Sequence, residues 1–127
     1  MAHKNENWVG GSFHNITILA TVNEIISVLG EADCQDNTGR DKTNFDWNGE
    51  TESGIGFTVY DWKEYRPIGM DEKISFHIGG KDFMETSTAK QELLRDIEDR
   101  KLEASGLDKG TYDAINELNE IQQDEEA

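Results

Sequence analysis

The sequence predicts an α+β fold in which a short helix precedes an antiparallel sheet of three or four strands, and a long helix and a short last helix follow. Three observations predict it. Apolar residues recur at helical spacing over residues 22–29, alternate with polar residues in three segments between 43 and 78, and return to helical spacing after residue 88. An antiparallel sheet covered on its apolar face by helices satisfies all of these patterns.

The first helix has the clearest boundaries. Thr21 and Glu24 have the spacing of a capping box, in which each side chain accepts the backbone N–H of the other residue. The apolar stripe that follows consists of Val22, Ile25, Ile26 and Leu29. Gly30 is placed to end the helix with a positive φ. A short amphipathic helix packed by one face is therefore expected.

Three strands are expected from alternation. Residues 43–47, 55–59 and 74–78 alternate largely apolar with polar side chains, which is typical of half-buried strands. Residues 48–54 contain two glycines and are expected to form a hairpin loop. The connection over residues 63–71 contains the only proline and should leave the sheet and return. A further short strand is expected within the segment from Phe13 to Leu19.

Two helices are expected in the last third of the chain. Residues 88–91 again have capping-box spacing and precede an apolar stripe that Ser105 and Gly106 interrupt. The last helical stripe consists of Tyr112, Ile115, Leu118 and Ile121. An acidic tail follows over residues 122–127. An exposed apolar stripe on this last helix would favour a homodimer.

Length and composition indicate one domain. The 127 residues suit a flexible lead-in at 1–15, a single α+β domain at 16–104, and a short helix with the acidic tail at 105–127. Cys34 is the only cysteine, so no disulfide can form within the chain and packing must hold the fold. No apolar run approaches the roughly 18 residues of a membrane helix, and residues 1–6 do not resemble a signal peptide. A cytoplasmic protein is expected.

The charge of the chain restricts its partners. With 27 Asp and Glu against 12 Lys and Arg, the formal charge is −15. A field of this sign repels nucleic acid and acidic membranes, which argues against direct binding to either. The same charge suits docking on a basic protein, including one whose normal ligand is nucleic acid. Simple solubility is the other interpretation of the acidic composition.

The residues with the most chemical potential lie around the second and third predicted strands. If Phe57 and Val59 face the core, alternation places Tyr60 and Trp62 on the opposite face, where His77 also belongs. Aromatic rings there could stack a planar ligand that basic side chains fix in place, as nucleotide binding requires. The candidate ligand-binding residues are Tyr60, Trp62, Lys63, Arg66, His77 and Asp46. The alternative is that Trp62 and Tyr65 pack under the 63–71 connection, with Lys63 and Arg66 paired to neighbouring acids.

No catalytic or metal-binding motif is evident. His77, Asp46 and Asp61 combine suitable metal ligands, but their spacing matches no known metal motif. Cys34 lies in an acidic segment, which should raise the pKa of the thiol and so disfavour nucleophilic catalysis. The sequence therefore predicts no catalytic residue, metal or cofactor, and a protein that is not an enzyme.

Three segments resemble small proteins of tailed bacteriophages: Phe45-Asp46-Trp47, residues 57–67, and His77-Ile78-Gly79-Gly80. The resemblance covers about the first two-thirds of the chain and implies a phage origin. Small acidic phage proteins often act by binding, so a non-enzymatic protein that counters host defence is expected. Its partner would be a nucleotide-like signal that it sequesters, or a basic nuclease or CRISPR effector that it blocks by acidic mimicry. A small structural or interaction protein of the phage is a further alternative.

Overall fold

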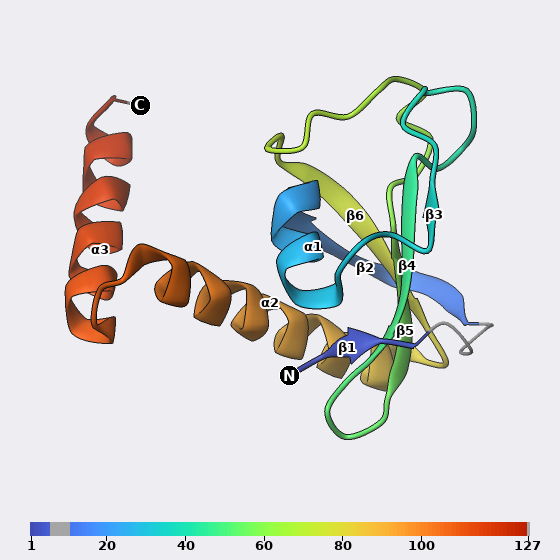
Figure 1. Ribbon diagram of the computed structural model, residues 1–127, viewed down its shortest axis with the longest axis horizontal. Helices are drawn as coiled ribbons and strands as arrows, with labels where there is room; N and C mark the ends of the chain where they lie inside the picture. The colour runs from blue at the N-terminus through green and yellow to red at the C-terminus, as the bar shows by residue number, and fades with distance from the viewer. Residues whose placement is uncertain (6–10, 127) are drawn as a thin grey trace. The chain divides into compact units, whose positions relative to one another are not determined.

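The computed structural model describes residues 1–5 and 11–126, with side chains described as far as residue 118 (Figure 1). It confirms the predicted α+β class. In chain order the elements are β1 (His3–Lys4), β2 (Ser12–Ala20), α1 (Val22–Leu29), β3 (Cys34–Gln35), β4 (Phe45–Glu50), β5 (Gly56–Tyr60), β6 (Ile74–Gly80), α2 (Phe83–Ser105) and α3 (Lys109–Glu126). Strands β4, β5 and β6 overlap the three strands that alternation predicts, although β4 starts at Phe45 and continues to Glu50, inside the predicted hairpin loop.

The strands form one open antiparallel sheet in the order β1-β4-β5-β6-β2, and β3 also pairs with β4. The two-residue strands β1 and β3 both pair with β4, at one end of this order. Strand β2 lies at the other end and pairs with β6. Its register shifts between Phe13 and Thr17, where Asn15 has a φ of 61°, so β2 contains an irregular segment next to a regular one.

One face of the sheet forms the core. Phe45, Trp47, Phe57, Val59 and Phe76 are at most 1% exposed, and their sequence neighbours on each strand face the other side. Helix α1 lies over this sheet in Figure 1, and both α1 and α2 contribute buried side chains. Those side chains are Val22, Ile25, Leu29, Ala89, Leu93 and Ile97.

Helix α1 forms as its sequence predicts. The Thr21 hydroxyl accepts the N–H of Glu24 at 3.0 Å, and the Glu24 carboxylate accepts the N–H of Thr21 at 2.8 Å. Gly30 follows with a φ of 78°, and its N–H donates to the carbonyl of Ile26. Trp47 ties the end of the helix to the core by donating its Nε1–H to the Gly30 carbonyl at 2.9 Å.

Helix α2 begins earlier than predicted. The capping box expected at residues 88–91 lies inside the helix, which starts at Phe83 because Asp82 caps it by accepting the N–H of Glu85 at 2.8 Å. The Thr88 hydroxyl donates instead to the Met84 carbonyl, four residues before it. A Ser/Thr-x-x-Glu/Gln pattern is therefore not sufficient to start a helix when a better cap precedes it.

The lead-in expected over residues 1–15 contains ordered structure. Strand β1 pairs with β4, and the N–H of the buried Ala2 donates to the Asp96 carboxylate of α2 at 2.7 Å. Strand β2 already begins at Ser12. These residues are ordered by contacts with β4 and α2, which are distant in the sequence. The local sequence gives little indication of such contacts. Residues 6–10, which include Trp8, lie outside the described part of the chain.

The chain divides into two compact units, Met1–Ile97 and Glu98–Ala127. The second unit holds the end of α2 and all of α3, which continues through the segment predicted as an acidic tail. The predicted break between the helices is confirmed, since α2 ends at Ser105 and Gly106 has a φ of 69°. In the described residues, every helix is too short or too polar to cross a membrane.

Candidate functional site

The face of the sheet opposite the core carries a cluster of four aromatic rings: Phe13, Tyr60, Trp62 and His77. The Phe13 and His77 rings are stacked at 4.0 Å between centroids, with 10° between their planes. Trp62 stacks less closely on His77 at 6.2 Å and 30°. Tyr60 meets both Trp62 and His77 edge to face, at 6.0 Å and 5.5 Å. The predicted second face therefore exists, and Tyr60, Trp62 and His77 lie together on it.

The aromatic cluster is accessible. Trp62 is 40% exposed and Phe13 is 39% exposed. Tyr60 and His77 are half-buried between them. Burial lowers the pKa of His77 and raises the pKa of Tyr60, so both rings are neutral at physiological pH. The cluster can therefore present uncharged ring surface to a ligand.

Two lysines flank the exposed indole of this cluster. Lys63 Nζ lies 5.5 Å from the centroid of the Trp62 ring, and Lys42 Nζ lies 5.9 Å from it. Both distances are within the range of a cation–π interaction. Within the described chain neither ammonium group forms an ion pair, although acids outnumber bases by more than two to one. Two positive charges are thus available beside an exposed ring.

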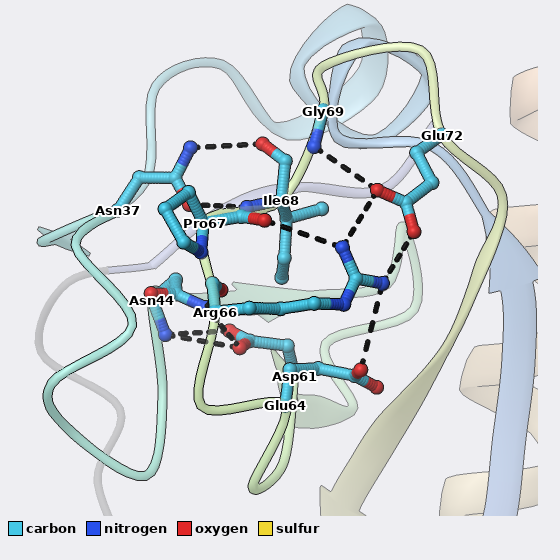
Figure 2. Close-up of polar contacts among 9 residues, drawn as sticks. All are labelled: Asn37, Asn44, Asp61, Glu64, Arg66, Pro67, Ile68, Gly69 and Glu72. Carbon is cyan, nitrogen blue, oxygen red and sulfur yellow. Dashed lines mark hydrogen bonds and ion pairs between the residues drawn. The ribbon is translucent and has the colours of Figure 1, made fainter.

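A buried carboxylate holds the two loops that carry these lysines. Asp61 is fully buried and accepts the backbone N–H groups of Asn44 and Phe45, both at 2.8 Å. It also accepts the Asn44 side-chain N–H at 3.0 Å (Figure 2). Two residues after Asp61, the N–H of Lys63 donates to the Lys42 carbonyl at 2.7 Å. Trp62 lies between Asp61 and Lys63. The network therefore fixes where the Trp62 loop begins.

A second asparagine joins the same loops further out. The Asn37 amide accepts the N–H of Ile68 at 2.7 Å and donates to the Ile68 carbonyl at 2.8 Å, as a neighbouring strand would (Figure 2). The Asn44 amide bridges both sides, since it accepts the N–H of Gly39 and donates to the carbonyl of Arg66. We refer to Asn37, Asn44 and Asp61 as the loop clamp.

The clamped loop contains backbone in an unfavourable conformation. Lys63 has a φ of 55° and Tyr65 a φ of 51°, in the left-handed region that residues with a Cβ rarely adopt. Each such residue costs roughly 1 kcal/mol or more and persists only when its surroundings hold it. The loop clamp supplies these surroundings, and the result is an outward-facing Trp62 and a 54% exposed Tyr65. Trp62 stacks on His77 and is 40% exposed, whereas the alternative places Trp62 and Tyr65 under the 63–71 connection.

The structure does not bring Arg66 to the aromatic cluster. Its guanidinium pairs with Glu72, with Nη1 at 2.9 Å from Oε1, and with Glu64 at 3.7 Å (Figure 2). This pair, together with the N–H of Gly69, lowers the pKa of Glu72. Arg66 thus closes the turn of its own loop. Its pairing with neighbouring acids is what the alternative interpretation expects for this side chain.

Asp46 lies opposite Tyr60 in the β4–β5 register, without a basic partner among the described ion pairs. Burial is the main cause that raises its pKa, and the negative charges of Asp33 and Asp61 add to it. Because the folded state binds this proton more tightly than the unfolded state, ionised Asp46 destabilises the fold above its folded pKa. It is a poor candidate for holding an anionic ligand.

We therefore expect Asp46→Asn to stabilise the protein at pH 7 by about 0.5 to 1 kcal/mol, since the group stays partly hydrated. The gain should disappear near pH 3, where aspartate is protonated in both states. Urea unfolding at the two pH values measures this. Asp36→Asn, at an exposed position, is the control and should show no comparable gain. An equal gain at both pH values would rule out the electrostatic cause.

Cys34 is exposed on β3, opposite Asp46. The carboxylate of Asp46 is the main cause that raises the thiol pKa, followed by burial and by Asp36 and Asp41. The prediction of a raised thiol pKa is confirmed. In the described residues, no three histidine, cysteine or acidic side chains come together in a way that could hold a metal ion.

A polar depression of about 400 Å³ lies at the β1 edge, lined by Lys4, Ala32, Asp33 and Asn48. Its polar groups already bind one another. Lys4 Nζ lies 3.4 Å from the Asp33 carboxylate, which also accepts the N–H of Asn48 at 2.7 Å. The aromatic cluster, with its unpaired lysines, is the better candidate for a ligand site.

The comparisons with known proteins found no matching family model and no similar curated protein. The site is therefore interpreted from its own geometry. Two of its members were not among the predicted site residues. Phe13 reaches His77 only through the β2–β6 pairing, and Lys42 reaches Trp62 only through the loop clamp. Alternation could have placed Phe13 on this face, but no local pattern identifies Lys42.

Proposed function

We propose that the protein is a binding protein without chemistry of its own, which holds a planar, negatively charged small molecule of the nucleotide type on the aromatic cluster. The observation that carries the proposal is the exposed Trp62 ring with Lys42 and Lys63 beside it. A ligand base can stack on the indole while its phosphate pairs with the ammonium groups.

The positive charges beside Trp62 contrast with the negative charge of the whole protein. The protein carries a formal charge of −15, so its surface as a whole repels anions. Lys42 and Lys63 have no described ion pair, and their charges offset this repulsion beside the exposed Trp62 ring. An anion that also has an aromatic ring gains from both features, whereas inorganic phosphate gains only from the charges. Selectivity for nucleotides over simple anions is expected.

The rigid loop suits binding better than catalysis. The loop clamp holds Lys63 and Tyr65 in strained backbone conformations, so less freedom remains to be lost when a ligand binds. No nucleophile paired with a base is evident near Trp62 among the described side chains. The resemblance to phage proteins suggests a setting for such binding, in which the protein sequesters a nucleotide signal of host defence.

Replacing Trp62 with alanine is expected to weaken nucleotide binding about 10- to 100-fold, the usual range for losing one stacked aromatic ring. Titration calorimetry with AMP, adenosine, a cyclic dinucleotide and inorganic phosphate measures this. Lys42→Gln and Lys63→Gln should each weaken binding of the phosphorylated probes and leave adenosine unaffected.

The controls lie in the same loop. Tyr65→Ala removes an exposed ring that has no described contact with the cluster, and Arg66→Gln removes a cation already paired with Glu72. Both should bind AMP nearly as the unchanged protein does. If Trp62→Ala binds as well as the unchanged protein, or if no probe binds at millimolar concentration, the aromatic cluster is not a nucleotide site.

Acidic mimicry of nucleic acid is a second candidate, favoured by the unit that begins at Glu98. Residues 98–127 contain ten Asp and Glu against three Lys and Arg. The described acids of this unit that are exposed are Glu98, Asp99, Glu103, Asp108, Asp113 and Glu117. Each of the three bases forms an ion pair with a described acid, and the seven acids in excess leave most of the negative charge uncompensated. Salt-sensitive binding to a basic nuclease, competed by DNA, would identify this role.

A further inference from the structure

The outer edge of β2 is an open edge of the sheet. Strand β2 bonds to β6 on one side, and among the described residues no backbone hydrogen bond joins its other side to any segment. At the opposite end of the sheet, β1 and β3 cover β4, and Lys4 of β1 forms an ion pair with Asp33, the residue before β3. The β2 edge thus presents backbone N–H and C=O groups that another strand can bind.

This open edge lacks the features that normally prevent pairing. Residues 12–23 contain no Asp, Glu, Lys, Arg or Pro, in a chain in which 31% of residues are charged. Natural edge strands are usually protected by such residues or by irregular backbone. Here the irregular backbone is confined to the part between Phe13 and Thr17. The following segment, Thr17–Ala20, is regular, and it carries Leu19, which is 62% exposed.

We propose that the Thr17–Ala20 edge of β2 pairs with the same edge of a second copy of this chain. Two copies with a charge of −15 each repel one another, so they must meet at a surface without charge. An antiparallel strand is complementary to itself across a two-fold axis, so a second copy needs no further surface to fit. The dimer has one continuous antiparallel sheet.

The geometry of the strand selects the register. In an antiparallel pair, residues directly opposite each other point to the same face of the sheet. Two-fold symmetry therefore requires that one residue lies opposite its own copy, and this residue is the centre of the register. Centring on Thr17 would use Asn15, which has a positive φ, and centring on Leu19 would use Thr21, whose N–H is bound by Glu24. Centring on Ile18 pairs Thr17 with Leu19 and Ile16 with Ala20, and so avoids both of these residues. Thr17 of one copy then lies opposite Leu19 of the other.

The pairing also places the two aromatic clusters on one surface. Phe13 of β2 stacks on His77, and both lie on the sheet face that carries Leu19. Joining two β2 strands therefore continues this face from one copy to the next, and the dimer presents two ligand positions on the same side. The dimer itself does not depend on what the clusters bind.

Sedimentation velocity of the full chain from about 5 to 200 µM tests the pairing, a range suited to a small interface. A dimer should form, and its dissociation constant should fall several-fold between low and high salt because salt screens the repulsion. Leu19→Glu should weaken it at least about 10-fold. Leu118→Glu on α3, at a similar exposure of 59%, should not. A monomer throughout, or loss of the dimer only with Leu118→Glu, overturns the inference.

Cross-linking tests the register. In a Cys34→Ser background, Thr17→Cys and Leu19→Cys are made as separate proteins. Mixing them under mild oxidation should produce a disulfide-linked heterodimer, because opposite residues have suitable Cα separations. Each protein alone should cross-link far less. A dimer that is sensitive to Leu19→Glu but gives no excess of mixed disulfide overturns the Ile18-centred register.

Discussion

Asp61→Ala is expected to lower the free energy of unfolding by about 3 kcal/mol or more. The fully buried carboxylate accepts the backbone N–H groups of Asn44 and Phe45, and those residues are each 1% exposed. Without the carboxylate both donors stay buried and unpaired, which costs roughly 1 to 3 kcal/mol each. Urea unfolding measures the loss, and amide hydrogen exchange at Asn44 and Phe45 should locate it.

Asp41→Ala provides the matched control for this carboxylate. Asp41 is exposed and lies in one of the loops that the clamp joins, so its removal should change stability by less than about 0.5 kcal/mol. If both variants lose the same small amount, the buried carboxylate does not hold the loops. If Asp61→Ala is less stable but exchange at Asn44 and Phe45 is unchanged, the loss arises elsewhere.

Gly39→Ala is expected to be the second large effect, at about 3 kcal/mol or more. A Cβ at Gly39 would lie 2.5 Å from the Cα of Arg66 and 2.6 Å from its backbone N, so one of the clamped loops must move. Gly39 also has a φ of 78°, which costs a residue with a Cβ about 1 to 2 kcal/mol. Thermal or urea unfolding measures the sum.

Gly54→Ala separates the two causes. Gly54 has a φ of 92° and no atom within 4 Å of an added Cβ, so this variant carries the conformational cost alone. It should lose only about 1 kcal/mol. Similar losses for Gly39→Ala and Gly54→Ala would show that the two loops are not in tight contact. Because the backbone of Gly39 lies close to that of Arg66, Gly39→Ala should lose more stability than Gly54→Ala.

Local sequence was sufficient wherever the determining interactions are local. The capping box of Thr21 and Glu24 and the apolar stripe of α1 form within one segment, and the structure reproduces both. Strand alternation likewise placed Trp47 and Phe57 in the core and Tyr60 and His77 on the other face. A period of two leaves each strand only one way to bury its apolar side chains.

The start of α2 shows where local patterns are ambiguous. Asp82 and Thr88 are both acceptable caps, and the choice between them depends on what the first helical turn packs against. Thr86 is fully buried beside Gly80, where its side chain fills the space that a Cβ on the glycine would need. That contact favours a helix which already includes Thr86.

By itself the sequence determined the fold class, the first helix and the two faces of the sheet, because these follow from periodicity and capping. Only the tertiary structure decided which side chains meet Trp62. Lys42 arrives through the loop clamp and Phe13 through the β2–β6 pairing, whereas Arg66 is held by Glu72. Contacts between distant segments depend on how loops close, and no repeating pattern in the chain encodes that closure.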